Sequence, residues 1–185
     1  MKKISIFASG GGSNAQKIHD YFAGNSEVCI DTVICNNPKA GILDRSKSWG
    51  CEQYVISKDK FRNTEELSEL LLSRKTDLIV LAGFLWLVPV SLLKAFPNKI
   101  VNIHPALLPK YGGKGMHGSN VHQAVFDAKE KESGITIHYI NEEYDKGDVV
   151  FQAACSVEGL EPEEIAKKVL ELEHFHFPRV IETLL

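Results

Sequence analysis

The chain has 185 residues, of which 44% are hydrophobic and 24% are charged, and its formal net charge is −3. This balance argues against a protein that binds nucleic acid or an anionic membrane surface, because both classes carry an excess of basic residues. A chain of this length can remove roughly 70% of its unfolded surface from water around one core. We therefore expect a single domain that spans residues 1–185.

The first third of the chain alternates strands with helices. An apolar run predicts a strand at residues 3–8, and helical spacing after a glycine turn predicts a helix at 13–22. A β-branched run at 28–35 is closed by a turn and predicts the second strand. A helix at 40–49 and a short strand at 53–56 follow.

The middle of the chain continues the alternation. The segment Asn63-Thr64-Glu65-Glu66 has the arrangement of a capping box and predicts a helix that runs to about Lys75. The strand at 78–82 is the most apolar, so we expect it at the centre of a sheet that is covered on both faces. A short helix is predicted after Pro89, and a strand at 100–104.

The last third changes this pattern. Ser119 is predicted to cap a helix at 119–128. The strands at 135–139 and 149–156 have no helix between them, which indicates an antiparallel element. Pro162 begins a final helix that runs nearly to the end of the chain, and its core-facing stripe is expected to comprise Ile165, Val169, Leu172 and His176.

Together these elements predict an α/β fold. We expect one doubly wound, mostly parallel sheet with helices on both faces and an antiparallel element near the C-terminus. No repeat, linker or low-complexity tract divides the chain.

Four cysteines, at positions 29, 35, 51 and 155, form no CxxC pair. Cys29 and Cys35 fall in one predicted strand, about 20 Å apart, and are therefore too distant to bridge. The thiols are typical of a reducing compartment. The apolar start is too short for a signal peptide, and no run reaches the length of a membrane span of about 18 residues. We therefore expect a cytoplasmic protein.

A glycine-rich loop, Ser9-Gly10-Gly11-Gly12-Ser13-Asn14, joins the first strand to the first helix. Gly10, Gly12 and Ala15 satisfy GxGxxA, so a dinucleotide-binding site is one interpretation. That interpretation requires an acid at the carboxyl end of the second strand, whereas Asp31 falls near its beginning. We prefer a phosphate cradle at the helix N-terminus, and a plain glycine turn is the remaining alternative.

Asn102 and His104 end a strand and are followed by Pro105, which stops it. Residues two apart in a strand project from the same face, so both side chains should enter one space. The amide can donate to a developing oxyanion, and the imidazole can donate or move a proton. A buried structural histidine beside a turn-capping asparagine is the alternative.

A second polar cluster, residues 141–148, includes Asp145. A calcium loop is excluded because its glycine falls at the seventh position and Gln152 replaces the twelfth-position glutamate. A plain solvated loop remains possible, but such a loop can carry a carboxylate to the edge where Asn102 and His104 end. The histidine pairs 174/176 and 117/122 lack the spacing of metal ligands, so no metal is expected.

Four motifs in this order carry a family resemblance: the glycine loop, residues 102–105, Leu107-Leu108-Pro109-Lys110 and Tyr144-Asp145-Lys146-Gly147. With them the chain resembles the phosphoribosylglycinamide formyltransferase family, folate-dependent enzymes of purine synthesis. Leu81-Ala82-Gly83-Phe84 also looks like the family's segment before the folate pocket. The resemblance extends from the first strand to the last helix.

The resemblance implies a formyltransferase-type Rossmann-like fold. It also implies transfer of a formyl group from 10-formyltetrahydrofolate, a co-substrate, to the amine of glycinamide ribonucleotide in IMP biosynthesis. The implied partners are these small molecules, with neither nucleic acid nor membrane, and the implied assembly is a monomer or weak homodimer.

The site residues that the resemblance implies fall into three groups. Asn102, His104 and Asp145 would be the catalytic trio. The substrate phosphate would be held by Gly12, Ser13 and Asn14, and the ribosylglycinamide by Glu173. The folate contacts would be Leu85, Trp86, Leu87, Val88, Asn102, Asn141, Glu142, Glu143, Tyr144 and Asp145. Family members often carry arginine at Trp86 and near Thr64, which leaves the preference for the folate tail open.

The implied chemistry is attack of a neutral amine on the formyl carbon to give a tetrahedral oxyanion. Asn102 and a protonated His104 would stabilise it. Asp145 would move the amine proton and keep His104 protonated. Formyltetrahydrofolate hydrolase, methionyl-tRNA formyltransferase and a non-catalytic nucleotide-binding module are the alternatives, the first two being expected to carry additional domains.

Overall fold

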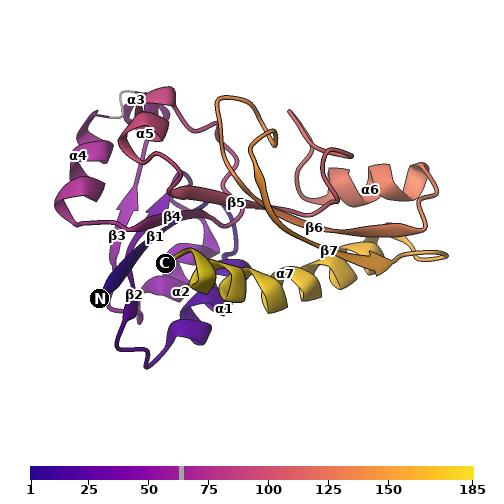
Figure 1. Ribbon diagram of the computed structural model, residues 1–185, viewed down its shortest axis with the longest axis horizontal. Helices are drawn as coiled ribbons and strands as arrows, with labels where there is room; N and C mark the ends of the chain where they lie inside the picture. Colours follow the sequence, from indigo (N-terminus) through magenta and orange to yellow (C-terminus); the bar gives the residue numbers. More distant parts are fainter. Residues whose placement is uncertain (63–64) are drawn as a thin grey trace.

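The computed structural model describes residues 1–62 and 65–185. Over these residues the chain forms a seven-stranded sheet with the order β3-β2-β1-β4-β5-β6-β7, drawn in Figure 1. The strands are β1 (Lys2–Ala8), β2 (Val28–Cys35), β3 (Glu52–Val55), β4 (Leu78–Leu81), β5 (Ile100–His104), β6 (Glu132–Tyr139) and β7 (Val149–Ser156). The first five are parallel, whereas β6 is antiparallel to both β5 and β7.

Helices cover both faces of the sheet. They are α1 (Ser13–Phe22), α2 (Gly41–Ser46), α3 (Lys58–Arg62), α4 (Glu65–Ser73), α5 (Val90–Ala95), α6 (Ser119–Asp127) and α7 (Pro162–Leu184). Side chains of α1, α2 and α7 share one core cluster with Ile4 and Val80, and those of α3, α4 and α5 share a second cluster with Phe7 and Ile79. The alternation of neighbouring strand residues between the two clusters shows why the strands are apolar on both faces.

The predicted fold class is confirmed, including the antiparallel element and the central position of β4. Three details were wrong. The helix predicted at 40–49 covers only Gly41–Ser46, the helix α3 was not expected, and Ser119 is the first helical residue rather than the cap. Gly118 occupies the cap position, and no side chain caps α6. The start of the predicted capping box, Asn63-Thr64, lies outside the described residues.

The predicted stripe of α7 was partly wrong. Ile165 and Val169 are buried, but the buried positions then continue through Glu173 and Phe177, while Leu172 and His176 are half-buried. A four-residue spacing links Ile165, Val169, Glu173, Phe177 and Ile181, and Pro178 and Val180 are buried beside them. The carboxylate of Glu173 is therefore buried at a point in the helix where the apolar periodicity predicted Leu172 to be buried.

The connections create a crevice at one edge of the sheet. From β1 the chain winds outward through β2 and β3, then returns to β4 on the other side of β1. The glycine loop follows β1 and residues 82–89 follow β4, and the two loops meet where Ser9 N–H donates to the Gly83 carbonyl at 3.0 Å. In open α/β sheets, ligands bind outside the carboxyl ends of the strands at such a switch point.

Two further observations concern the cysteines and the helices. All four cysteines are free thiols. Over the described ranges, no helix combines the length and apolarity that a membrane crossing requires.

Candidate active site

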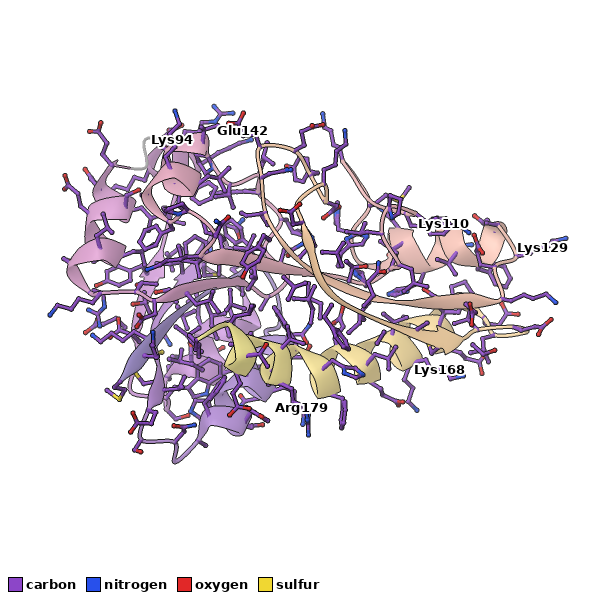
Figure 2. The ribbon with its side chains drawn as sticks, viewed as in Figure 1. Lys94, Lys110, Lys129, Glu142, Lys168 and Arg179 are labelled. Carbon is purple, nitrogen blue, oxygen red and sulfur yellow. The ribbon has the colours of Figure 1, made fainter. Side chains whose placement is uncertain are left out.

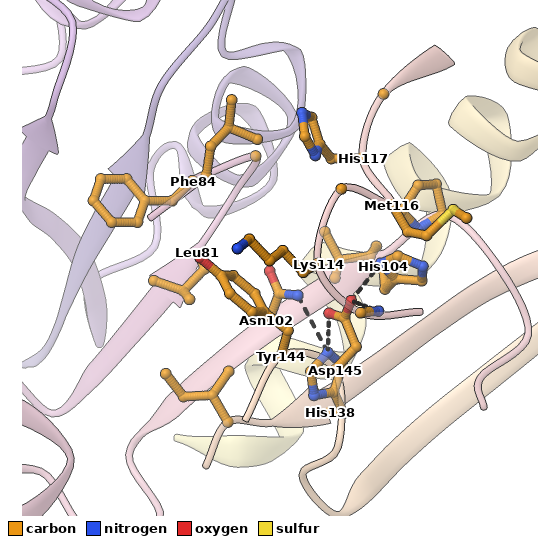
Figure 3. Close-up of a pocket in the computed structure, with 18 of the residues that line it drawn as sticks. Leu81, Phe84, Asn102, His104, Lys114, Met116, His117, His138, Tyr144 and Asp145 are labelled. Carbon is orange, nitrogen blue, oxygen red and sulfur yellow. Dashed lines mark hydrogen bonds and ion pairs between the residues drawn. The ribbon is translucent and has the colours of Figure 1, made fainter. Parts of the chain in front are cut away.

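A cavity of about 710 Å³ opens at the carboxyl ends of β1, β4 and β5. Its walls come from the loop after β4, the loop between β5 and α6, the β6–β7 loop, and one side of α7. Asn102, His104 and Asp145 all line it, as do Asn14 and Glu173. Figure 3 shows the trio converging from β5 and the β6–β7 loop. One cavity therefore joins residues that the sequence separates by 159 positions.

Asn102 is oriented by a histidine on the neighbouring strand. Antiparallel pairing places His138 of β6 opposite Asn102, and the Asn102 Nδ2 donates to His138 Nε2 at 3.2 Å. His138 Nδ1 must carry the proton, because it donates to the Tyr139 carbonyl at 2.8 Å. The amide nitrogen has two protons, so one N–H of Asn102 remains available to a ligand in the cavity.

His104 is 3% exposed and has a defined tautomer. Its Nε2 donates to the Tyr111 carbonyl at 2.8 Å, which leaves Nδ1 facing Asp145 Oδ2 at 3.6 Å. Burial lowers the pKa of His104 below its ordinary value and outweighs the opposing effect of Asp145. His104 is therefore neutral at pH 7 in the free protein, with Nδ1 as a proton acceptor.

This finding corrects one expectation. Asp145 was expected to keep His104 protonated, but removal of the imidazole from water disfavours its charged form more strongly than the carboxylate favours it. A proton must therefore reach His104 from a ligand before this histidine can donate to an oxyanion.

Asp145 lies between Gly113, His104 and His138. Its Oδ2 accepts the Gly113 N–H at 2.8 Å, and its Oδ1 lies 3.7 Å from His138 Nε2. Burial raises the pKa of Asp145, but His138 and His104 in their protonated forms, together with the Gly113 N–H, lower it below the ordinary value. Asp145 is thus a carboxylate at neutral pH. Its φ of 55° is in the left-handed region, a strained conformation that functional residues often adopt.

Two hydrogen bonds from α2 hold the glycine loop in place. The Ile42 N–H donates to the Gly10 carbonyl at 3.1 Å, and Arg45 Nε donates to the Gly11 carbonyl at 2.7 Å. Gly12 has a φ of 73°, and a Cβ there would lie 2.6 Å from Ile42 Cδ1. Gly12 therefore permits close packing on α2. Gly12 and Ser13 are not among the residues that line the cavity, whereas Asn14 is.

Asn14 and Glu173 contact each other directly, from α1 and α7. Asn14 Nδ2 donates to Glu173 Oε2 at 2.6 Å, and Asn14 Oδ1 is buried without a partner among the described residues. Glu173 is only 7% exposed, and burial raises its pKa to about 7 despite the hydrogen bond from Asn14. Groups of this kind are typical of ligand sites, where a bound molecule supplies the missing hydrogen bonds.

We expect Glu173→Gln to change how stability depends on pH. The folded protein disfavours the ionised form of Glu173, so ionisation lowers the free energy of unfolding. This loss is absent below pH 4.5, grows as the pH rises to about 7, and is constant at higher pH. The full loss is about 3 kcal/mol. Glutamine keeps an acceptor for Asn14 but cannot ionise, so the variant should gain stability over the parent between pH 5 and pH 8.

Urea unfolding at pH 5 and at pH 8 measures this difference in stability between the variant and the parent. Glu171→Gln is the control, because Glu171 is exposed on the same helix. Parallel stability curves for the Glu173→Gln variant and the parent would show that Glu173 ionises as freely as a surface carboxylate.

An apolar wall faces the trio. Leu85, Trp86, Leu87 and Val88 all line the cavity; Leu85 and Leu87 are 50% and 42% exposed, and Val88 is buried. The Trp86 ring lies against Phe61 and Phe84, at centroid distances of 5.4 and 6.1 Å. Large exposed apolar side chains around a cavity favour a flat organic ligand.

The β6–β7 loop completes this wall, with Asn141, Glu143 and Tyr144 lining the cavity. Glu142, expected with them, instead lines a second cavity of about 340 Å³ together with Lys94. Figure 2 shows both side chains at the same rim of the molecule. Glu142 is the one expected folate contact of this loop that the structure turns away from the main cavity.

Several residues that line the cavity were not predicted from the sequence, among them His138, Gly113 and His122. His138 could have been found, because a strand was predicted at 135–139 and antiparallel pairing beside β5 brings one of its residues opposite Asn102. The Gly113 N–H acts through its backbone and leaves no signal in residue type. His122 lines the cavity from α6, its buried Nδ1 has no hydrogen-bond partner in the part of the chain that the structure describes, and burial lowers its pKa.

Comparison with known proteins identifies the family of this chain. The family model described as formyl transferase matches residues 2–181. The chloroplastic phosphoribosylglycinamide formyltransferase of Arabidopsis thaliana is 41% identical, over 97% of this chain and 64% of that protein. The phosphoribosylglycinamide formyltransferase of Bacillus subtilis is 31% identical, over 100% of this chain and 95% of that protein.

Solved structures agree with these sequence relatives. The crystal structure of phosphoribosylglycinamide formyltransferase from Bacillus halodurans aligns with a TM-score of 0.89 and 32% identity, over 100% of this chain and 95% of that one. The chain spans less than two thirds of the length of its relatives from Arabidopsis thaliana and Vigna unguiculata. With nearly its whole length matched by the family model, the chain belongs to the formyl transferase family.

Proposed function

We propose that this chain transfers the formyl group of 10-formyltetrahydrofolate to the amine of glycinamide ribonucleotide, as a single formyltransferase domain acting in the cytoplasm. The observation that supports this most strongly is the convergence of Asn102, His104 and Asp145 in a cavity that also reaches Asn14 and Glu173. The first three suit acyl transfer, and the last two suit a ribosyl substrate. The names of the relatives point to the same reaction.

Each reactant has its own part of the cavity in this proposal. The phosphate lies at the N-terminus of α1, where the first N–H groups of a helix lack intrahelical partners and carry partial positive charge. The buried Glu173 accepts hydrogen bonds from the ribosylglycinamide. The pterin of the donor lies against the wall formed by Leu85, Leu87 and Tyr144.

The trio then performs the transfer. The free N–H of Asn102 donates to the oxygen of the formyl group as it gains negative charge. Asp145 and the neutral His104 take the proton that the attacking amine loses, and this pair returns a proton to the folate nitrogen that departs. The low pKa of His104 suits this role, because a histidine that is already protonated could not accept.

The contacts proposed for the ribonucleotide, at Asn14 and Glu173, together with the trio separate this proposal from its alternatives. A hydrolase needs no ribonucleotide, and a non-catalytic binding module needs no trio. We also propose that the protein acts as a monomer or weak homodimer, with these two small molecules as its substrates and no metal.

An absorbance assay tests the proposal. The purified chain should convert formyl-folate to tetrahydrofolate when glycinamide ribonucleotide is added, and only slowly without it, because water lacks the contacts that hold an acceptor for attack. Steady turnover without the ribonucleotide would assign the chain to the hydrolases. No turnover in either mixture would favour the binding module.

A further inference from the structure

Lys114 is distinctive among the residues of the cavity wall. Of the described residues that line the cavity, it is the only lysine or arginine. Across residues 1–62 and 65–185, its side chain has no ion pair and no hydrogen bond, whereas Lys110 pairs with Glu130 and Lys146 pairs with Glu143. A free ammonium group beside an apolar wall is available to an anion that enters the cavity.

The backbone places this lysine next to the reacting groups. Gly113 donates its N–H to Asp145, so the residue before Lys114 is anchored to the trio. Gly113 and Gly115 have φ values of 99° and 89°, a conformation that glycine adopts without steric cost. Figure 3 shows the Lys114 side chain extending across the cavity toward the side that carries Phe84 and Tyr144.

The anion that fits this position follows from the proposed function, on which this inference rests. Both reactants are anionic, but the phosphate has the N-terminus of α1 and lies on the side of Asn14. In the proposed function the donor, which carries the glutamate carboxylates, occupies the apolar side of the cavity. The acids of the lining on this side are already engaged: Glu143 pairs with Lys146, and Asp145 accepts the Gly113 N–H and faces His104. We propose that Lys114 binds a carboxylate of the glutamate tail of formyl-folate and thereby sets the preference for donors that carry this tail.

Kinetics with paired donors test this assignment. Lys114→Met keeps the length and apolar stem of the side chain but removes its charge. It should raise the KM for 10-formyltetrahydrofolate about five- to tenfold at low salt, which is the scale of one partly exposed charge contact. The KM for the ribonucleotide and the turnover should stay within about twofold. Lys114→Arg should restore most of the affinity.

A donor without the glutamate, 10-formyltetrahydropteroate, supplies the decisive comparison. Parent and Lys114→Met should use it equally well, because the contact that the variant lacks is absent from the donor. Lys129→Met is the matched control, since Lys129 lies at the far end of the molecule in Figure 2. An equal loss with both donors, or a rise in the KM for the ribonucleotide instead, would overturn the assignment.

Equilibrium binding separates this inference from the activity. Trp86 lines the cavity, so binding of tetrahydrofolate and tetrahydropteroate can be followed by tryptophan fluorescence without turnover. Loss of the tail preference in Lys114→Met would support the inference even if the parent transferred no formyl group. An unchanged preference would refute it even if the parent were fully active.

Discussion

Replacing Asn102 or His104 by alanine should lower formyl transfer at least about 100-fold, the scale of one lost oxyanion donor or of one lost proton-transfer group. Asn102 supplies the one N–H of its amide that does not contact His138. His104 supplies Nδ1 as the proton acceptor, because its Nε2 contacts the Tyr111 carbonyl. The KM values should change much less than turnover, because both groups act on charge that develops only during the reaction.

The alanine at position 104 leaves a small void, since the imidazole is buried. Near-ultraviolet circular dichroism and thermal unfolding therefore accompany the kinetics. His19→Ala is the control, because His19 stacks on Trp49 outside the cavity. If both variants fold and turn over at nearly the parent rate, the trio is not the reacting site.

Asp145→Asn should lower turnover by about 10²–10⁴-fold, the usual contribution of a positioned proton acceptor. Asparagine is the informative replacement, because it tolerates the positive φ of this position and can still accept the Gly113 N–H. The variant therefore keeps the shape of the loop and loses the charge that pairs with a proton on His104.

Single-turnover kinetics measure the chemical step of this variant directly. Asp148→Asn serves as the matched control, since Asp148 is exposed in the same loop and does not line the cavity. A full rate in Asp145→Asn would mean that the amine proton leaves by another route, and the role assigned to the Asp145–His104 pair would be wrong.

The fold was largely predictable because its strands carry a strong signal. The bounds of β2 and β5 match the predicted ranges, since β-branched or apolar runs end there at polar turns. The periodicity of apolar residues in α7 also predicted that a long helix forms there, but it did not predict which face is buried. Glu173 is buried by its contact with Asn14, and a hydrophobic period cannot identify a buried carboxylate.

The site was predictable where it depends on one strand and not where it depends on pairing between strands. The shared face of Asn102 and His104 follows from their spacing of two. His138 enters through the register of β6 on β5, and the support of Gly11 by Arg45 enters through the packing of α2. The protonation of His104 was predicted wrongly because burial, which opposes the charge of Asp145, is a property of the folded chain.

The destination of the formyl carbon tests the central claim most directly. The purified chain would be incubated with donor labelled isotopically in its formyl group, with and without glycinamide ribonucleotide, and the products separated by mass. The label should appear on the amine of the ribonucleotide in step with the loss of donor. Label that appears as free formate at the same rate with or without the ribonucleotide would contradict formyl transfer to this amine.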